Sequence, residues 1–249
     1  MSRSFDGVDD KIVCADITPL DDMVTLTLAG WFYVKGVDNT GSRSWYFHKA
    51  DDDLTNGWTL GVDDITASQL RMEFTIGWSL STGAWAWWHT GANYITMNKW
   101  TFLSVTYDGS LTTNDPIIYF DEVSQGLTES RAPAGTLDTD NTRVLTIGNA
   151  TTAVDRTLNG SVGYCHVYNR VLSIFELKQI KKYPGSIRKG LVTNLNMWGG
   201  LPEPDYSGNG GNGTVTGAIK GLSDPPINGI YYPRRYREWG FVSAAGQPW

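Results

Sequence analysis

Cysteine and histidine are scarce in this chain, and their scarcity excludes two kinds of stabilising site. The 249 residues contain two Cys and three His, and no CxxC pair occurs. We therefore expect neither a metal finger nor a disulfide scaffold. Cys14 and Cys165 each lie in an apolar, strand-like run, which predicts two small buried thiols. A bridge between them would require that their strands be neighbours.

An excess of positive charge and long apolar runs are also lacking. The chain has 20 Lys and Arg against 26 Asp and Glu, and its net charge of −6 argues against nucleic acid as a partner. No apolar run approaches the about 20 residues that a membrane span needs. The first ten residues, MSRSFDGVDD, lack the apolar core of a secretion signal. We expect no nucleic-acid binding, no membrane span and no standard route of secretion.

Familiar catalytic motifs are missing as well. A glycosidase needs two carboxylates that face each other across the scissile bond, and no Glu-x-Asp-x-x-Glu spacing occurs to place acids on one strand face. Glu73 and Glu129 stand alone, and the adjacent Asp121 and Glu122 would point to opposite faces of a strand. GxSxG, Walker A and HExxH motifs are also absent. We predict that the protein is not an enzyme, with glycoside hydrolase as a remaining alternative.

Short segments of alternating apolar and polar residues fill most of the chain. In MVTLTLAGWFYV (23–34), Val24, Leu26 and Leu28 share one face, opposite Thr25 and Thr27. Similar segments, separated mostly by Gly, Asn, Asp or Pro, follow as far as residue 169. This pattern predicts an all-β sandwich or barrel.

One segment has helical spacing instead. In LSIFELKQIKKY (172–183), apolar residues recur at Leu172, Phe175, Leu177 and Ile180. Ser173 followed by Glu176 matches a capping box, and Pro-Gly at 184–185 ends the pattern. We expect one short helix there.

Eleven Trp residues raise the question of a ligand surface. Trp85 and Trp87 share one face of a predicted strand and Trp88 takes the other, while Trp78 lies across a hairpin turn. Exposed aromatic rings can stack on sugars, but Trp also fills the cores of β proteins. Because a sandwich buries one face of each sheet, we expect either Trp85 and Trp87 or Trp88 to be exposed.

The stretch DYSGNGGNGTVTG (205–217) is rich in Gly and Asn. A strand pattern follows it, so a phosphate cradle, which leads into a helix, is not predicted. Asp205, Asn209 and Asn212 could ligate Ca²⁺, an ion that prefers oxygen. The same residue types also form left-handed turns without any ligand, and both alternatives remain open.

After residue 222 the chain changes character. Residues 223–249 are rich in Pro, Tyr, Trp and Arg and lack strand alternation, which indicates an extended C-terminal arm on a domain of residues 1–222. Interface hot spots are enriched in these residue types. We expect the arm to dock on another protein subunit or to fold back over an edge strand. The candidate docking residues are Tyr231, Tyr232, Arg234, Arg235, Tyr236, Arg237 and Trp239.

Four stretches together resemble the laminin G-like, concanavalin A-like lectin–glucanase jelly-roll family. They are SFDGVDDKIV (4–13), LTLAGWFYV (26–34), KWTFLSVTYDGS (99–110) and LNGSVGYCHVYNRVLSIFEL (158–177). The resemblance implies a two-sheet antiparallel jelly roll that binds glycans or proteins, often with Ca²⁺. In the family, a segment like residues 190–218 normally precedes the opening strand, so the order here resembles a circular permutation.

These observations lead to two functional expectations. The first is a non-catalytic structural or adhesive protein on a virion or particle surface, such as a bacteriophage decoration or attachment component that also binds cell-surface glycan. The arm and the missing secretion signal favour it. The alternative is a free, lectin-like carbohydrate-binding module that is extracellular by a non-standard route, which the Trp cluster favours.

Overall fold

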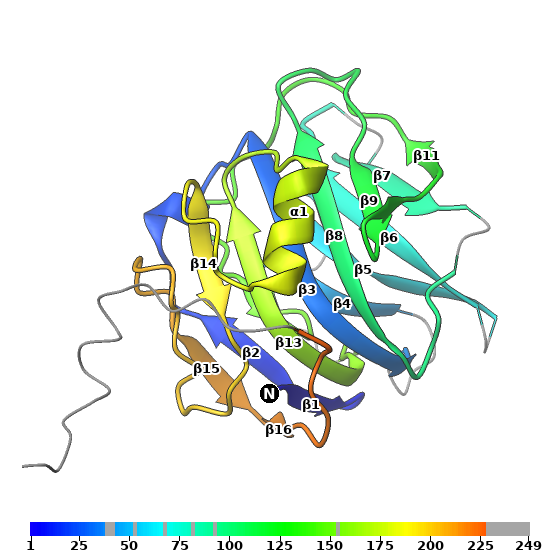
Figure 1. Cartoon of the computed structure of the whole chain (residues 1–249). Helices are drawn as coiled ribbons and strands as arrows, with labels where there is room; N and C mark the ends of the chain where they lie inside the picture. Colours follow the sequence, from blue (N-terminus) through cyan, green and yellow to red (C-terminus); the bar gives the residue numbers. More distant parts are fainter. Residues whose placement is uncertain are drawn as a thin grey trace, which may run out of the picture.

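The structure, a computed structural model, describes residues 1–37, 43–51, 54–66, 69–80, 83–91, 94–152 and 155–227. Within these ranges the chain forms two antiparallel sheets of eight strands each, packed as a jelly-roll sandwich, with one α-helix (Figure 1). The predicted all-β sandwich with one short helix is confirmed.

Sheet A has the strand order β10, β9, β8, β3, β13, β1 and β16, with β14 also paired to β13. Its strands are β1 (Arg3–Asp6), β3 (Thr25–Gly36), β8 (Trp100–Asp108), β9 (Ile117–Phe120), β10 (Val123–Ser124), β13 (Asn159–Tyr168), β14 (Leu191–Leu195) and β16 (Ile219–Lys220).

Sheet B has the order β11, β7, β6, β5, β4, β12, β2 and β15. Its strands are β2 (Lys11–Cys14), β4 (Arg43–Ala50), β5 (Gly57–Thr66), β6 (Gln69–Gly77), β7 (Trp85–Thr90), β11 (Leu127–Arg131), β12 (Thr146–Ile147) and β15 (Gly213–Thr216). A short 3₁₀ helix, Thr18–Leu20, connects β2 to β3.

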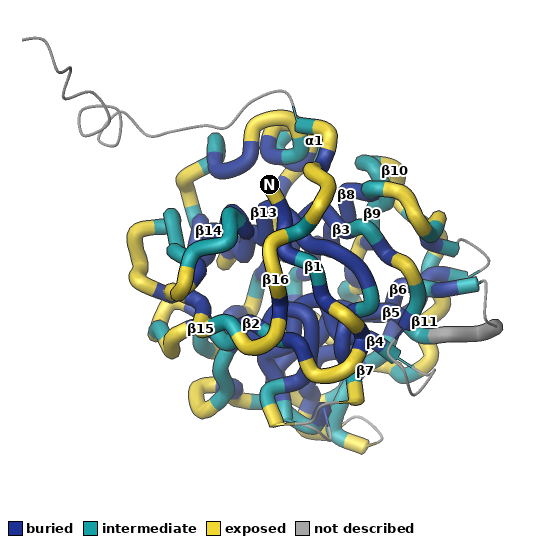
Figure 2. The backbone as a smooth tube through the Cα atoms, turned by 90° about the horizontal axis from the view of Figure 1, so that it is seen from below, coloured by how far each residue is buried: buried dark blue, intermediate teal, exposed yellow. Residues whose placement is uncertain are grey.

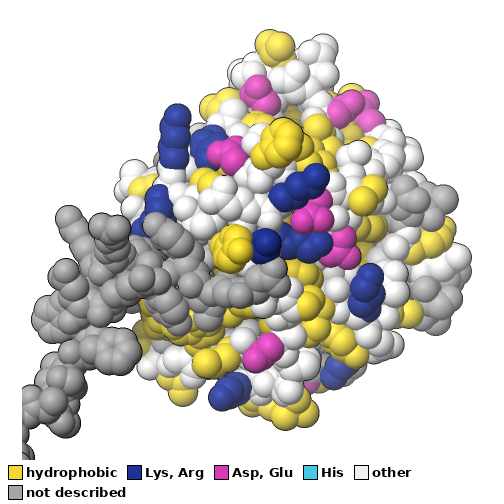
Figure 3. Space-filling model, in the orientation of Figure 1, with side chains coloured by type: hydrophobic (Ala, Val, Ile, Leu, Met, Phe, Trp, Pro, Cys, Tyr) yellow, Lys and Arg dark blue, Asp and Glu magenta, His cyan; other side chains and the backbone are white. Residues whose placement is uncertain are grey.

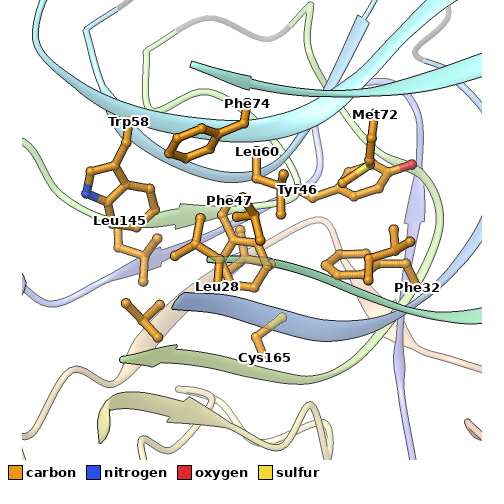
Figure 4. Packing of buried hydrophobic residues seen from close by; sticks show 14 of the residues in the cluster. Leu28, Phe32, Tyr46, Phe47, Trp58, Leu60, Met72, Phe74, Leu145 and Cys165 are labelled. Atoms are coloured by element: carbon orange, nitrogen blue, oxygen red, sulfur yellow. The ribbon is translucent and has the colours of Figure 1, made fainter. Parts of the chain in front are cut away.

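The main core lies between the two sheets. Leu28 and Phe32 of β3 meet Phe47, Leu60 and Phe74 of sheet B in this layer (Figure 4). The central strands are buried along most of their length, whereas β16 at the rim is exposed (Figure 2). The predicted inward face of β3 holds for Leu26 and Leu28 but not for Val24, which precedes the strand and is exposed.

The helix α1 (Ile174–Lys182) covers the outer face of sheet A (Figure 1). Its predicted capping box is present: Ser173 accepts from the Glu176 backbone, and the Glu176 side chain accepts from the Ser173 backbone. Leu177 and Ile180 are buried in a second cluster on sheet A. Phe175, expected on the same apolar face, is 78 % exposed. It lies two residues from Leu177, about 200° around the helix, so the prediction for Phe175 was wrong.

The sequence predicted that no segment spans a membrane, and α1 is nine residues long. Within the part of the chain that the structure describes, no helix is long and apolar enough to cross a membrane.

The segment after α1 completes both sheets. β1 pairs with β13 at Asn159–Val162, and β14 pairs with the same side of β13 at Cys165–Tyr168. β14 and β1 therefore follow each other end to end in the same direction, as a circularly permuted order predicts. β15 extends sheet B beside β2, and β16 extends sheet A beside β1.

A buried ion pair joins β1 to the segment between β14 and β15. The Arg3 Nε donates to the Glu203 carboxylate at 3.0 Å, and the Arg3 guanidinium also donates to the carbonyl oxygens of Gly200 and Ala218. Further along, the Asp224 carboxylate pairs with the Met1 amino group at 2.8 Å. Residues 198–224 thus contact the sandwich through these ion pairs and hydrogen bonds as well as through the strand pairing of β15 and β16.

The seven candidate docking residues, at positions 231–239, lie outside the described residues. The docking arm and the domain boundary at residue 222 stay predictions.

Cys14 and Cys165 are both buried and unbridged, as expected of small core thiols. They come from β2 in sheet B and β13 in sheet A, so their strands are not hydrogen-bonded neighbours. Burial raises the pKa of both thiols.

Asp121 and Glu122 depart from the prediction that they point to opposite faces of a strand. Both have positive φ, 47° and 67°, and form the turn between β9 and β10. Both carboxylates pair with Lys181 of α1, at 3.1 and 3.0 Å. They are a link between the hairpin and the helix.

Candidate ligand-binding face

The four candidate Trp side chains separate into two pairs. Trp88 is 0 % exposed and Trp78 is 3 % exposed, so both belong to the core. The Trp88 indole N–H donates to the Asp115 carboxylate at 2.8 Å. The prediction that Trp78 and Trp88 contact a glycan was wrong, because a ring enclosed between the sheets cannot stack on a sugar.

Trp85 and Trp87 lie on the outer face of sheet B. Both are partly exposed, whereas Ala86 and Trp88, which alternate with them along β7, are buried. The expected division of β7 into an exposed and a buried face is confirmed. The two outer rings are neighbours, with centroids 5.9 Å apart and planes inclined at 51°.

Two arginines contact the Trp87 ring. The guanidinium carbons of Arg43 from β4 and Arg71 from β6 are each 5.6 Å from the ring centroid. Such contacts contribute about 0.5–1 kcal/mol each at exposed sites. Asp63 holds Arg71 in place, since its Oδ2 accepts from Nε at 3.1 Å and from Nη2 at 2.7 Å.

Trp85 carries a third arginine. The Arg131 guanidinium, from β11, lies 3.8 Å from the Trp85 ring centroid. Its Nη1 also passes close to Gly83 in the turn before β7, where an added Cβ would lie 2.7 Å away. Gly83 has φ +77°, so both its conformation and this close approach favour glycine.

Glu73 of β6 lies beneath this group of side chains. It is 1 % exposed, and its Oε1 is 3.5 Å from the Arg43 Nε. Burial raises the pKa of Glu73 from 4.5 to about 7, against the opposing effect of Arg43. His89, its cross-strand partner, has a lowered pKa through burial and through Arg71, whose Nη1 is 3.4 Å from Nε2.

The rest of this outer face is partly covered. Trp45 of β4 is buried in a small cluster with Ala50, Leu54 and Ala150, against which Trp85 packs. The Trp45 ring lies across Gly61 of β5, where a Cβ would come within 2.6 Å of the ring. The exposed part of the face is therefore the β6–β7–β11 side.

The Gly- and Asn-rich loop is organised by its own hydrogen bonds. The Asp205 carboxylate accepts from the backbone N–H groups of Asn194, Ser207 and Gly211 and from the Ser207 hydroxyl. The Asn212 side-chain oxygen accepts from the Asp205 N–H, and the Asn209 amide donates to Val192 O. These bonds account for the loop conformation, and Ca²⁺ binding by Asp205, Asn209 and Asn212 stays a prediction.

A second group of carboxylates lies in the turn between β1 and β2. One oxygen atom each of Asp6, Asp9 and Asp10 lies within 4.8 Å of the others. Hydrogen bonds account for the positions of Asp6 and Asp10, because Asp10 accepts from the Asp6 N–H and Asp6 accepts from the Val8 N–H, both at 2.8 Å.

Sequence reasoning identified the two outer Trp residues but missed the polar groups around them. Glu73 was expected to stand alone, yet it is paired with Arg43 and lies near Asp63. These residues come from three strands, and the register that brings them together is not contained in any local pattern. The available signal was the spacing of two between Arg71 and Glu73 and between Trp87 and His89, which places each pair on one face of its strand.

The sequence profile of the Concanavalin A-like lectin/glucanases superfamily matches residues 6–178. This match spans well over half of the chain. The chain belongs to this superfamily. The β14–β16 segment, which completes both sheets, lies beyond the match.

Solved structures show the same fold. A protein from Bacteroides ovatus ATCC 8483, described as a candidate carbohydrate-binding protein, aligns over 90 % of this chain with 17 % identity and a TM-score of 0.66. This chain spans 60 % of that protein. A heptameric SAP-like pentraxin from Limulus polyphemus aligns over 72 % of this chain and 80 % of its own, with 12 % identity and a TM-score of 0.53. None of the curated proteins matches the sequence significantly.

Proposed function

We propose that this superfamily member is a non-catalytic, lectin-like carbohydrate-binding protein, and that the glycan binds to the outer face of sheet B at Trp85 and Trp87. The observation that carries the proposal is the pair of partly exposed indoles, 5.9 Å apart and surrounded by fixed polar side chains. The superfamily and the description of the Bacteroides ovatus protein are in agreement with it.

The chemistry of the face suits a sugar. A pyranose has apolar C–H surfaces that pack on aromatic rings and hydroxyl groups that need donors and acceptors. Here Arg43, Arg71 and Asp63 supply these polar groups beside Trp87. Because cation–π contacts and ion pairs already hold the side chains, little entropy remains to be lost when a ligand binds.

The carboxylates of this face are poorly placed for glycoside hydrolysis. Asp63 is engaged by two hydrogen bonds from Arg71, and Glu73 is buried beneath the surface. A hydrolase would need one carboxyl group to protonate the leaving oxygen and another to reach the anomeric carbon or its water. We therefore favour binding without turnover.

The virion-surface interpretation has less support than the lectin-like one. Its main argument was the arm of residues 223–249, of which residues 228–249 lie outside the described part. Display on a particle, and a location there, remain expectations from the sequence.

The proposal is tested by screening the protein on a glycan panel and then measuring affinity by titration calorimetry. Trp85→Ala and Trp87→Ala should each weaken binding at least about tenfold, since stacking and contact area are lost. Trp100→Ala is the matched control, because Trp100 is a partly exposed strand Trp on sheet A.

Binding that survives in both folded outer-face variants, or that is lost only in Trp100→Ala, would refute this location. Sugar release from a bound polysaccharide that stops in Glu73→Gln would refute the non-catalytic part of the proposal.

A further inference from the structure

We infer that the glycan recognised by the Trp85–Trp87 face is acidic, and that Arg131 binds its carboxylate or sulfate group. This inference rests on the proposed function and specifies the ligand class. Its evidence is the arrangement and the pairing of three arginines on one face of an otherwise acidic protein.

Arg131 contributes a guanidinium that contacts the aromatic ring of Trp85. Among the described residues this guanidinium takes part in no salt bridge or hydrogen bond, and its carbon lies 3.8 Å from the centroid of the Trp85 ring. The side chain is partly exposed. The five N–H donors of a guanidinium lie in its own plane, so a cation–π contact leaves those that point past the ring accessible to a ligand.

The positive charges of the other two arginines on this face already have carboxylate partners. Arg71 donates twice to Asp63, and Arg43 lies 3.7 Å from Asp63 and 3.5 Å from Glu73. Their function in the site is to hold Trp87. Of the three arginines, Arg131 is thus the one whose donors have no acceptor within the described part of the chain and can bind a ligand.

On the opposite face of the sandwich, Arg170 and Lys181 pair with carboxylates. On the face that carries α1, basic side chains stand beside acidic ones (Figure 3). Arg170 makes two hydrogen bonds to Glu176, and Lys181 pairs with Asp121 and Glu122. In a chain with a net charge of −6, Arg131 differs from these cations because it has no carboxylate partner among the described residues.

The chemistry that fits this donor set is an oxyanion attached to a sugar ring. Carboxylate and sulfate groups accept two parallel N–H bonds from one guanidinium, and such charge-assisted pairs are stronger than bonds to hydroxyl groups. The sugar ring that bears the oxyanion would then lie beside Arg131 and contact the partly exposed parts of Trp85 and Trp87 that Arg131 leaves uncovered. A neutral glycan would offer the Arg131 donors only the weaker acceptor oxygens of its hydroxyl groups.

The experiment compares matched ligands by titration calorimetry. The carboxylate pair is an oligogalacturonate and its methyl ester, and the sulfate pair is a sulfated oligosaccharide and its desulfated form. At least one acidic member should bind at least about tenfold more tightly than its neutral match. The pair that shows this margin identifies the oxyanion. The margin should shrink as salt concentration rises.

Variants of Arg131 supply the second comparison. Arg131→Gln should remove the advantage of the acidic ligand and leave the weak binding of the neutral one. Arg131→Lys should restore only part of it, because lysine keeps the charge but loses the planar donors. Arg188→Gln is the control, since Arg188 donates to backbone oxygens of the 205–217 loop. Thermal melting confirms that each variant folds.

The outcomes separate this inference from the proposed function. Equal affinity for acidic and neutral members of both pairs, with loss in Trp87→Ala, refutes the acidic ligand but keeps the glycan site. An acidic preference that persists in Arg131→Gln refutes the role of Arg131. Failure to bind any glycan on the panel or in these pairs refutes both.

Discussion

The outer faces of the two sheets use the same residue types in different ways. On sheet A, Trp31 is buried under α1, its indole N–H donates to the Lys181 carbonyl, and the Lys181 ammonium lies 5.6 Å from its ring. On sheet B, Trp85 remains partly exposed and Arg131 lies on its ring. The aromatic–cation contact stabilises a helix on one face, and on the other it orients a side chain toward solvent.

The pKa values of two glutamates, one on each face, also differ. Glu176, at the start of α1, is hydrogen-bonded by Arg170, which lowers its pKa to about 2. Glu73 also lies beside an arginine, but burial raises its pKa to about 7. An adjacent guanidinium therefore does not by itself keep a carboxylate ionised, because the cost of desolvation can exceed the attraction.

The largest expected effect is on the sheet A face. Leu177→Ala should lower the free energy of unfolding by about 2–5 kcal/mol, because it removes a fully buried side chain between α1 and the sheet. Chemical denaturation measures this loss, and the glycan affinity of the folded variant should not change.

Phe175→Ala is the matched control on the same helix. Its side chain is exposed, so the change should stay within about 0.5 kcal/mol. Equal destabilisation by the two substitutions, or a loss of glycan binding in folded Leu177→Ala, would remove the distinction between a packing face and a binding face.

Glu73→Gln should have a smaller, pH-dependent effect. Because the pKa of Glu73 is raised in the folded state, the folded protein holds this proton more tightly than the unfolded chain. Its contribution to stability is complete below about pH 4.5 and declines until the pH passes about 7, a total of about 3 kcal/mol.

The measurement is the difference in unfolding free energy between Glu73→Gln and wild type as a function of pH. Gln does not titrate, so this difference should increase in favour of the variant across that window. The difference also cancels the opposite slope expected from His166, whose pKa burial lowers to about 4. A difference that is flat with pH would show that Glu73 is ionised throughout.

Ca²⁺ should give the smallest effect. Asp205 already accepts four hydrogen bonds, so a cation in the loop would have to compete with them. Ca²⁺ at ten times its Kd would add about 1.4 kcal/mol of stability. Any rise in Tm between EDTA and CaCl₂ should be lost in Asp205→Ala. A rise that this variant keeps would place the cation elsewhere on the protein.

The features that the sequence predicted well depend on local patterns. The Ser173–Glu176 capping box and the alternation around Trp87 were sufficient to place α1 and the two faces of β7. The features that it did not predict depend on register between distant strands. Arg131 reaches Trp85 because β11 pairs with β7, with Arg131 opposite Trp87, and no spacing in the sequence encodes that pairing.

The most direct test of the central claim follows the indole N–H signals of the Trp residues by ¹⁵N NMR during titration with a glycan that the protein binds. Substitutions of single Trp residues assign the signals. The account predicts that the Trp85 and Trp87 signals shift with ligand concentration while those of Trp31 and Trp100 on sheet A stay in place. Shifts confined to Trp31 and Trp100, or saturating binding that leaves Trp85 and Trp87 unchanged, would contradict it.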